Sequence, residues 1–420
     1  YGSKPLSYYH GTNRFYDLWA STAAKDKELF HEFCRFVIGN PLRQQPAASG
    51  KPAAEQGYRT TGIQDLALIY QGGSHRLDWT VDEFRPYVVH RFADGSKDWL
   101  FDGFLFLEFK DGSGRNYTVG YEKLNARRTE WEWLLDRIFE QGKSLSALDR
   151  CIGQEIKELG KPAFRHQIVL GLPEAIRGQK DWGKLDGREM DFSKEEDQIA
   201  ATKWYIGELV ERFKAAKYKH LELSGFYWVA EDTHHCAELT IPLSEYIHSE
   251  GKLFYWIPYW QAKGHEEWKR LGFDVAYQQP NHFFNPSIPD SRLDEACATA
   301  RRHGMAMEFE FDEKATAAIP NSSYDRMVAY IDHFEKNDVF NSSAVAYYCG
   351  NRGVLTLDES DNPKDKALMD RLARIIQARR YLKYGIPMKN KTRVVAHRGF
   401  WHTDGSAQNS IASLLKADQL

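Results

Sequence analysis

The sequence is poor in cysteine and has no long apolar run. Its 5 cysteines are scattered over 420 residues without a CxxC pair, so neither a disulfide framework nor a thiolate zinc site is indicated. No apolar stretch approaches the roughly 20 residues that a membrane-spanning helix needs. An excess of one charge is also absent, because 56 Lys and Arg stand against 59 Asp and Glu. Nucleic acid and an anionic membrane surface are therefore not expected as main partners.

Cofactor and metal motifs are lacking as well. The stretch "YQGGSHR" does not have the GxGxxG spacing of a dinucleotide-binding loop. The adjacent histidines of "DTHHC" do not easily face one ion, and no HExxH motif accompanies them. We therefore expect neither a cofactor nor a metal in the functional site.

Aromatic residues, by contrast, are abundant. They make up 14% of the chain, with 12 Trp and 22 Tyr, and many stand beside Gly, Pro, Asn or Gln at the ends of apolar runs. Aromatic rims of this kind suit flat, partly apolar ligands such as sugar rings. Large cores also use many aromatic residues, so both explanations stay open at this point.

Between about Ile63 and Leu357 the chain repeats a short apolar run, a polar and aromatic cluster, and an amphipathic stretch. The apolar runs are "GIQDLALIYQGG", "DWLFDGFLFLEF", "RHQIVLGLPEAI", "YKHLELSGFYWVAE", "KLFYWIPYWQA", "GFDVAYQQPNHFF", "MAMEFEFDE" and "SAVAYYCGNRG". The helix candidates include "EWEWLLDRIFEQG", "DQIAATKWYIGELVERFKAAKY", "HEEWKRLG", "SRLDEACATARRHG" and "YDRMVAYIDHFEKN". Strands that alternate with helices imply parallel pairing, and eight such units close a barrel. We predict an α/β fold of the (β/α)8 TIM type, with an open doubly wound sheet as the alternative.

The chain divides into three predicted parts. Residues 1–60 form an N-terminal extension and a linker rich in Pro, Ala, Gly and Gln. Residues 61–386 form the barrel, closed by the helical pattern of "KDKALMDRLARIIQARRYLKYG". Residues 387–420 form an incomplete C-terminal βα segment. Nothing in the sequence indicates an oligomeric state.

The seventh run places carboxylates at every second position. Glu308, Glu310 and Asp312 alternate with Met307 and two phenylalanines, so a strand here has one acidic face and one apolar face. If the acidic face is the barrel lumen, Glu308 lies deeper, and Glu310 and Asp312 lie nearer the mouth, where barrel enzymes carry their chemistry. The alternative is that this face looks toward the helices, or that Arg or Lys neutralises it.

Glycoside hydrolysis needs two carboxyl groups at about 5 to 9.5 Å separation, so a partner for Glu310 has to come from another strand end. Our prediction is Glu231, in the fourth run, as the proton donor and Glu310 as the nucleophile or base. Glu308 and Glu108 are the alternates. For Glu231, a solvated loop carboxylate is an equally open explanation.

The other strand ends predict a sugar-binding rim. Stacking rings beside amide donors and acceptors fit hydroxyl-rich ligands better than phosphates, which call for Arg or Lys clusters or helix N-termini. The predicted substrate-binding residues, which include the alternates from the acidic strand, are Tyr70, His75, Arg76, Glu108, Trp228, Tyr259, Trp260, Tyr277, Gln278, Gln279, Asn281, Glu308 and Asp312.

The phrases "GIQDLALIYQGG", "DWLFDGFLFLEFKDG", "GQKDWGKLDGR", "FYWIPYW", "GFDVAYQQPNHFF" and "MEFEFDEKA" together resemble a bacterial family known as domain of unknown function 4855. The resemblance covers roughly Gly62 to Tyr384. It implies a secreted or surface-associated protein of polysaccharide-degrading bacteria, similar to barrel glycosidases, and hence an extracytoplasmic location. It brings no catalytic residues with it.

The C-terminal stretch "TRVVAHRGFWHTDGSAQNSIASLLKADQL" resembles the opening strand, loop and helix of a glycerophosphodiester phosphodiesterase. His397 and Arg398 match that family's His-Arg pair. Gln408 stands where the family has a metal-binding Glu, so the expected carboxylate ligand is missing. A lone βα unit cannot bury a core of its own, so we expect this segment to be inactive.

Three functions are consistent with these features. The first is a glycoside hydrolase that acts on a glycan through a carboxylate pair at the barrel mouth. The second is a non-catalytic carbohydrate-binding barrel in which the acidic strand is structural. The third makes the barrel a targeting module of a larger glycerophosphodiester phosphodiesterase.

Overall fold

The computed structural model describes residues 62–234 and 236–386. These residues belong to one compact unit, residues 51–386. The predicted extension at 1–60 and the C-terminal segment at 387–420, with His397, Arg398 and Gln408, lie outside the described residues. What the sequence predicts for those two segments stays a prediction.

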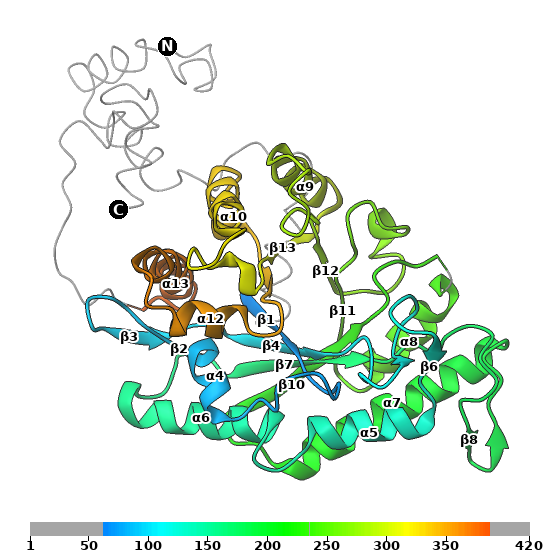
Figure 1. Ribbon diagram of the computed structural model, residues 1–420. Helices are drawn as coiled ribbons and strands as arrows, with labels where there is room; N and C mark the ends of the chain where they lie inside the picture. Colours follow the sequence, from blue (N-terminus) through cyan, green and yellow to red (C-terminus); the bar gives the residue numbers. More distant parts are fainter. Residues whose placement is uncertain (1–61, 235, 387–420) are drawn as a thin grey trace, which may run out of the picture. The chain divides into compact units, whose positions relative to one another are not determined.

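Eight parallel strands close into a barrel, which confirms the predicted (β/α)8 fold (Figure 1). Each strand pairs with the next one along the chain, and the last pairs with the first, so that no edge is left open. The strands correspond to the eight predicted apolar runs: β1 (Asp65–Tyr70), β4 (Gly103–Leu107), β7 (His166–Leu172), β10 (Leu221–Trp228), β11 (Leu253–Trp256), β12 (Val275–Gln278), β13 (Ala306–Glu310) and β14 (Val345–Tyr348).

Helices surround these strands. In Figure 1, α5, α6 and α7 lie beneath the strands, and α9, α10 and α13 lie above them. The helices are α4 (Val81–Val88), α5 (Arg128–Ile138), α6 (Ser144–Leu159), α7 (Glu195–Ala216), α8 (Ala237–Ser249), α9 (Ser291–His303), α10 (Tyr324–Lys336), α11 (Val339–Ser342), α12 (Gly353–Glu359) and α13 (Pro363–Tyr384), with the short 3₁₀ helices η2 (His265–Glu267) and η3 (Glu313–Ala315).

Within the described residues, three short two-stranded sheets lie in the loops outside the barrel. They are β2 (Val89–Arg91) with β3 (Lys97–Trp99), β5 (Arg115–Asn116) with β6 (Leu124–Asn125), and β8 (Lys184–Leu185) with β9 (Arg188–Glu189).

The connection from β11 to β12 departs from the prediction. The stretch "HEEWKRLG" was expected to be a helix, but only His265–Glu267 is helical, as a single 3₁₀ turn. Gly264 and Gly272 bound the stretch, and both have left-handed backbone, with φ of 90°. Left-handed backbone at both glycines confines any helix to the seven residues between them.

The core has two layers that follow from strand alternation. In β13, Ala306 belongs to the lumen cluster, whereas Met307 and Phe309 belong to the cluster between the strands and the helices. Side chains at every second position of a strand share a face. Glu308 and Glu310 therefore share the lumen face of Ala306, as the acidic alternation of this strand predicts.

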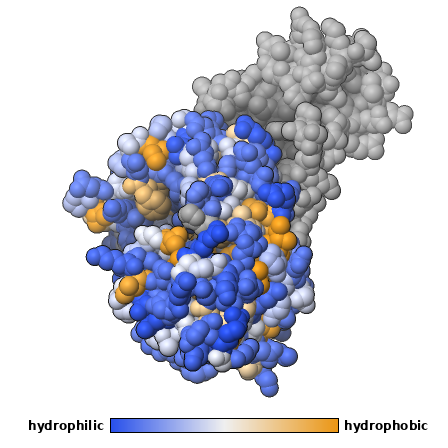
Figure 2. All heavy atoms as spheres, turned by 90° about the vertical axis from the view of Figure 1, so that its right-hand side faces the viewer, coloured by the Kyte–Doolittle hydropathy of each residue, from blue (hydrophilic) through white to orange (hydrophobic). Residues whose placement is uncertain are grey.

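One face of the described residues is largely polar. Figure 2 shows a face that is mostly hydrophilic, with small apolar spots separated from one another. Within residues 62–234 and 236–386, none of the helices has both the length and the apolar character needed to cross a membrane.

A buried ion pair between the last helix and the first strand lies at the N-terminal end of the barrel strands. Arg379 of α13 lies 3.0 Å from Asp65 of β1, and both side chains are almost fully buried. The guanidinium also donates to the carbonyl oxygens of Ser343, at 2.9 Å, and Gln64, at 3.2 Å. The Tyr347 hydroxyl donates to Asp65 at 2.8 Å. Burial raises the pKa of Asp65, and Arg379 opposes that rise.

Replacing Arg379 by Met should destabilise the barrel strongly. The change leaves the Asp65 carboxylate buried without its partner, which costs about 3–5 kcal/mol. Urea unfolding followed by circular dichroism measures the loss. Lys366→Met, on the exposed face of the same helix, is the control and should change stability by less than about 0.5 kcal/mol. Equal unfolding midpoints for both variants would refute the role given to this ion pair.

Candidate active site

A cavity of about 360 Å³ opens at the C-terminal mouth of the barrel. Seven of the eight barrel strands, or the loops that follow them, contribute to its wall; β7 does not. The residues that line the cavity are Leu68, Tyr70, Arg76, Leu107, Phe109, Lys110, Tyr121, Tyr227, Glu231, Ile257, Gln279, Asn281, Phe284, Glu308, Glu310 and Tyr348. The mouth of a TIM-type barrel is where its functional groups gather.

Glu310 ends β13 and is held by donors from two other elements. The backbone N–H groups of Asn281 and His282 donate to its two oxygens at 3.2 and 3.0 Å. The hydroxyl of Tyr330, a fully buried residue of α10, donates to Oε2. Burial raises the pKa of Glu310 to about 7, although these donors favour the charged form.

Glu308 lies one pleat deeper and is only 3% exposed. Among the described residues, no hydrogen bond to its carboxyl group is found, and the group faces the cavity. Burial, followed by the nearby Glu310 and Glu231, raises its pKa well above the ordinary value. This shift favours the protonated form of Glu308, which can donate a hydrogen bond into the cavity.

Glu231 follows β10 and faces the cavity from the neighbouring wall. Its Oε1 accepts a hydrogen bond of 2.6 Å from Nε2 of Gln279. Burial raises the pKa of Glu231, against hydrogen bonds from Gln279 and the Tyr121 hydroxyl that lower it. The structure thus brings Glu231, Glu308 and Glu310 together around one cavity.

Two amide side chains bridge the outer carboxylates. Oε1 of Gln279 accepts from Nδ2 of Asn281 at 2.8 Å, and the same Nδ2 lies 3.5 Å from Oε1 of Glu310. Asn281 has a φ of 48°, a left-handed conformation that Asn tolerates better than most residues. This conformation lets its backbone N–H and its side chain serve the same carboxylate. The chain of contacts Glu231, Gln279, Asn281 and Glu310 fixes the positions of both acids.

Aromatic rings form a continuous wall at the cavity. Tyr121 stacks on Phe109 with ring centroids 4.6 Å apart, and Phe109 meets Tyr70 edge-on at 5.6 Å. Tyr70 meets Tyr348 at 5.5 Å, and Tyr348 meets Phe284 at 5.2 Å. The two ends of the wall, Tyr121 and Phe284, are 42% and 49% exposed. Exposed rings beside carboxyl and amide groups are suited to stacking on the apolar face of a ring-shaped polar ligand.

Arg76 and Glu108 form a buried pair beside this wall. The guanidinium binds Glu108 through two hydrogen bonds, of 2.9 and 3.0 Å, and lies over the Tyr70 ring at 4.6 Å. Glu108 also accepts from the backbone N–H groups of Gly73 and Phe109, both at 2.9 Å. Arg76 reaches the cavity, but Glu108 does not line it. The predicted ligand contact for Glu108 is corrected: its carboxylate positions Arg76.

Three aromatic predictions for the rim are also corrected. Trp228 points away from the lumen, is 2% exposed and packs edge-on against Phe254. Trp260 packs against the outer core, beneath the Arg292 guanidinium. The Tyr259 hydroxyl donates to Asp232 at 2.9 Å, outside the cavity wall.

A local irregularity in β10 explains the position of Trp228. The register shifts between Leu223 and Gly225, and Leu223 faces outward whereas Tyr227 faces the lumen. Positions an even number apart share a face only in a regular strand. The extra residue therefore turns Tyr227 into the cavity and Trp228 away from it.

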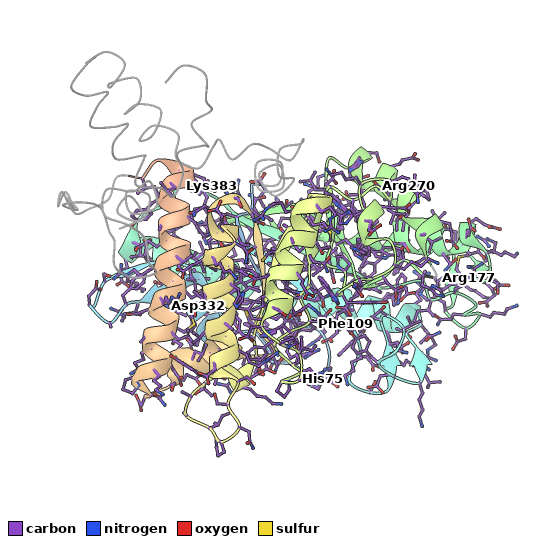
Figure 3. The ribbon with its side chains drawn as sticks, turned by 90° about the horizontal axis from the view of Figure 1, so that it is seen from above. His75, Phe109, Arg177, Arg270, Asp332 and Lys383 are labelled. Carbon is purple, nitrogen blue, oxygen red and sulfur yellow. The ribbon has the colours of Figure 1, made fainter. Side chains whose placement is uncertain are left out.

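Four further predicted residues lie outside the cavity wall. Tyr277 faces the lumen one pleat below Gln279. Gln278 is buried on the opposite face, and its side-chain amide donates a hydrogen bond to the backbone carbonyl of Gln279. His75, labelled in Figure 3, is exposed and lies over Gly112. Asp312 caps η3 by accepting from the Lys314 N–H at 2.7 Å. In each case the chain position predicted the right end of the barrel but not the direction of the side chain.

The sequence prediction missed Phe109, Tyr121 and Tyr348 in the cavity wall and Tyr330, which binds Glu310 from behind it. Phe109 and Tyr348 stand at the ends of strands that the sequence does reveal, so the same end-of-strand reasoning could have found them. Tyr121 comes from the insertion that carries β5 and β6, and Tyr330 comes from a helix outside the barrel. No local sequence signal distinguishes these two tyrosines.

The fold and the site define a TIM-type barrel with an acidic, aromatic-walled cavity at its C-terminal mouth. The chain belongs to the family described as Domain of unknown function (DUF4855), whose model matches residues 65–374. The family resemblance stated from the sequence is thereby confirmed for the barrel. No curated protein was found to match the chain.

Solved structures share the general architecture at low similarity. A Bacteroides thetaiotaomicron protein, a candidate alpha-L-fucosidase, is 14% identical, with a TM-score of 0.40 over 76% of this chain and 94% of its own. Tryptophan synthase subunit alpha from Legionella pneumophila is 9% identical, with a TM-score of 0.34 over 79% and 100%. The protein CbXyn10B is 12% identical, with a TM-score of 0.34 over 71% and 88%. These likenesses carry no argument for activity.

The stability of the barrel should fall as pH rises, and Glu308→Gln should remove part of that fall. Because the folded pKa of Glu308 is raised above its unfolded value of about 4.3, the stabilisation is complete below that value. It is lost as pH rises toward the folded pKa, at up to about 1.4 kcal/mol per pH unit. Melting temperatures between pH 5 and pH 8 should therefore show a gain for Glu308→Gln over the parent that grows with pH.

Glu222→Gln is the matched control, since Glu222 is exposed lower on β10. Its pH profile of melting temperature should follow that of the parent. A constant offset between Glu308→Gln and the parent at all pH values would contradict a raised pKa at Glu308.

Proposed function

We propose that this barrel is a glycoside hydrolase that acts on a glycan. The observation that carries the proposal is the convergence of three carboxyl groups of raised pKa, Glu231, Glu308 and Glu310, on one cavity that also has an aromatic wall. Paired carboxyl groups with shifted pKa values are what acid and base roles on a glycosidic bond require.

In the proposed mechanism Glu231 gives a proton to the leaving oxygen, because burial raises its pKa and so favours the protonated form. Glu310 acts in its ionised form, as the nucleophile or as the base on water. The donors from Asn281, His282 and Tyr330 stabilise that charge and hold the carboxylate in place. The raised pKa of Glu308 favours its protonated form, which would offer a hydrogen bond to a sugar hydroxyl.

The shape of the cavity supports a carbohydrate ligand. A volume of about 360 Å³ lies within the range of small-molecule pockets, at its lower end. The wall from Tyr121 to Phe284 offers ring faces, and Gln279, Asn281 and Arg76 offer hydrogen-bond partners. The extracytoplasmic location that the family resemblance implies belongs to this proposal, since polymeric glycans lie outside the cell.

Release of reducing ends from a panel of plant, host and bacterial glycans tests the proposal. Glu231→Gln and Glu310→Gln should each lower turnover by about 10²- to 10⁴-fold, the usual contribution of a general acid or base, while glycan binding persists. Glu222→Gln, on the exposed part of β10, should act like the parent. A loss in Glu308→Gln that matches the loss in Glu231→Gln would move the donor role to Glu308.

The rival function is a non-catalytic carbohydrate-binding barrel. If no glycan releases reducing ends and one glycan binds the parent and both variants equally, the hydrolase proposal fails and the binding function replaces it. The third function, a targeting module of a phosphodiesterase, is tested separately. A longer polypeptide that hydrolyses a glycerophosphodiester in a metal-dependent way would support it.

Tyr330→Phe should move the pH profile of the proposed reaction. The Tyr330 hydroxyl lowers the pKa of Glu310, so its loss should raise that pKa and shift the acidic limb of kcat/KM to higher pH, by up to roughly one unit. Tyr324→Phe, at the start of the same helix, is the control and should leave the limb in place. If the acidic limb does not move in Tyr330→Phe, the Tyr330 hydroxyl does not lower the pKa of Glu310 and its proposed role is refuted.

A further inference from the structure

A second cluster of ligand-type side chains lies outside the barrel mouth, where β11 connects to β12. His265 and Glu266 come from η2, and His303 ends α9. One potential ligand atom from each residue lies within 4.8 Å of the others. Nε2 of His303 and Oε1 of Glu266 are 3.7 Å apart. None of these residues lines the cavity.

The spacing is close to that of a coordination site. Zinc binds His nitrogen and Glu oxygen at about 2.0–2.2 Å, which places two ligand atoms of a tetrahedral site about 3.4 Å apart. The Glu266 to His303 distance of 3.7 Å approaches this value, and all three ligand atoms lie within 4.8 Å of one another. As a direct hydrogen bond, by contrast, 3.7 Å is too long.

Neighbouring groups hold the His265 imidazole and the backbone of His303. Nδ1 of His265 is 2.7 Å from the carbonyl oxygen of Ala262, so this nitrogen carries the proton and Nε2 keeps its lone pair. A metal-binding His typically has its other nitrogen bound to a carbonyl or carboxylate in this way. The indole N–H of Trp268 donates to the backbone oxygen of His303 at 3.0 Å, which ties the end of α9 to the loop after η2.

We propose that His265, Glu266 and His303 bind a divalent transition metal of the zinc class. Two imidazoles and one carboxylate are a ligand set that zinc accepts, with water completing the tetrahedron on the exposed side of Glu266. Mg²⁺ and Ca²⁺ prefer oxygen ligands and do not suit this set.

The position of the cluster suggests a structural role. The β11 to β12 connection has only the three residues of η2 in helical form, so it lacks the long helix that covers most other strands. A metal shared between η2 and α9 pins this connection to the neighbouring helix. The role is independent of the reaction proposed at the barrel mouth.

Zn²⁺ titration of the untagged full chain, by calorimetry and by thermal unfolding, tests the proposal. We expect saturable binding near one equivalent and a rise in melting temperature of roughly 3 °C at a hundredfold excess over Kd. Mg²⁺ at the same concentration should have no effect. Co²⁺ should give visible absorption typical of a tetrahedral nitrogen and oxygen site.

His303→Ala and His265→Ala should each abolish the thermal shift and the Co²⁺ absorption. His248→Ala is the matched control. His248 is an exposed histidine of α8 that pairs with Asp274, away from the cluster. This variant should respond like the parent. The proposal is overturned by an absent Zn²⁺ response in the parent, or by an equal response in His303→Ala and His265→Ala. Because two different variants remove ligands, misfolding of one of them leaves the other as the test.

Discussion

The parallel pairing of β1 with β14 is the contact on which the rest of the structure depends. Asp65 to Ala67 lie in register with Val345 to Tyr347, and this pairing turns an open sheet into a closed one. In a closed parallel sheet, the carboxyl ends of all strands meet at one rim. The rim gathers Tyr70 and Tyr348, which are far apart in the chain, into one aromatic wall. The Asp65 to Arg379 ion pair secures the closure from the opposite end of the barrel.

Closure of the barrel also has a desolvation cost, because it buries carboxyl groups that water would otherwise solvate. Glu310 is compensated by donors from the β12 loop and from α10, and Glu231 by an amide of Gln279. Glu308 has no such donor among the described residues, and its pKa is raised instead, which favours its neutral form. Arg76 does not neutralise these three acids, since Glu108 already binds its guanidinium.

The sequence predicted the strands well because each is a short apolar run between polar clusters, and this pattern depends only on burial. It predicted that Glu308 and Glu310 share one face of β13, because acidic and apolar residues alternate there without interruption, and the structure shows that this face is the lumen. It was wrong about Trp228 because the irregularity of β10 between Leu223 and Gly225 reverses the two faces. It was wrong about the helix at "HEEWKRLG", where only His265–Glu267 is helical and glycines with left-handed backbone stand at both ends.

The sequence by itself determined the (β/α)8 class, the order of the strands and the placement of Glu231 and Glu310 at strand ends, since hydrophobic periodicity and residue spacing are local properties of a chain. Only the tertiary structure decided that Tyr330 of α10 reaches Glu310, that Gln279 and Asn281 bridge two acids, and that His265 meets His303. Apart from the short link between Gln279 and Asn281, these contacts join residues that are 20 to 48 positions apart. Their distances depend on strand register and helix packing, which no single stretch of sequence encodes.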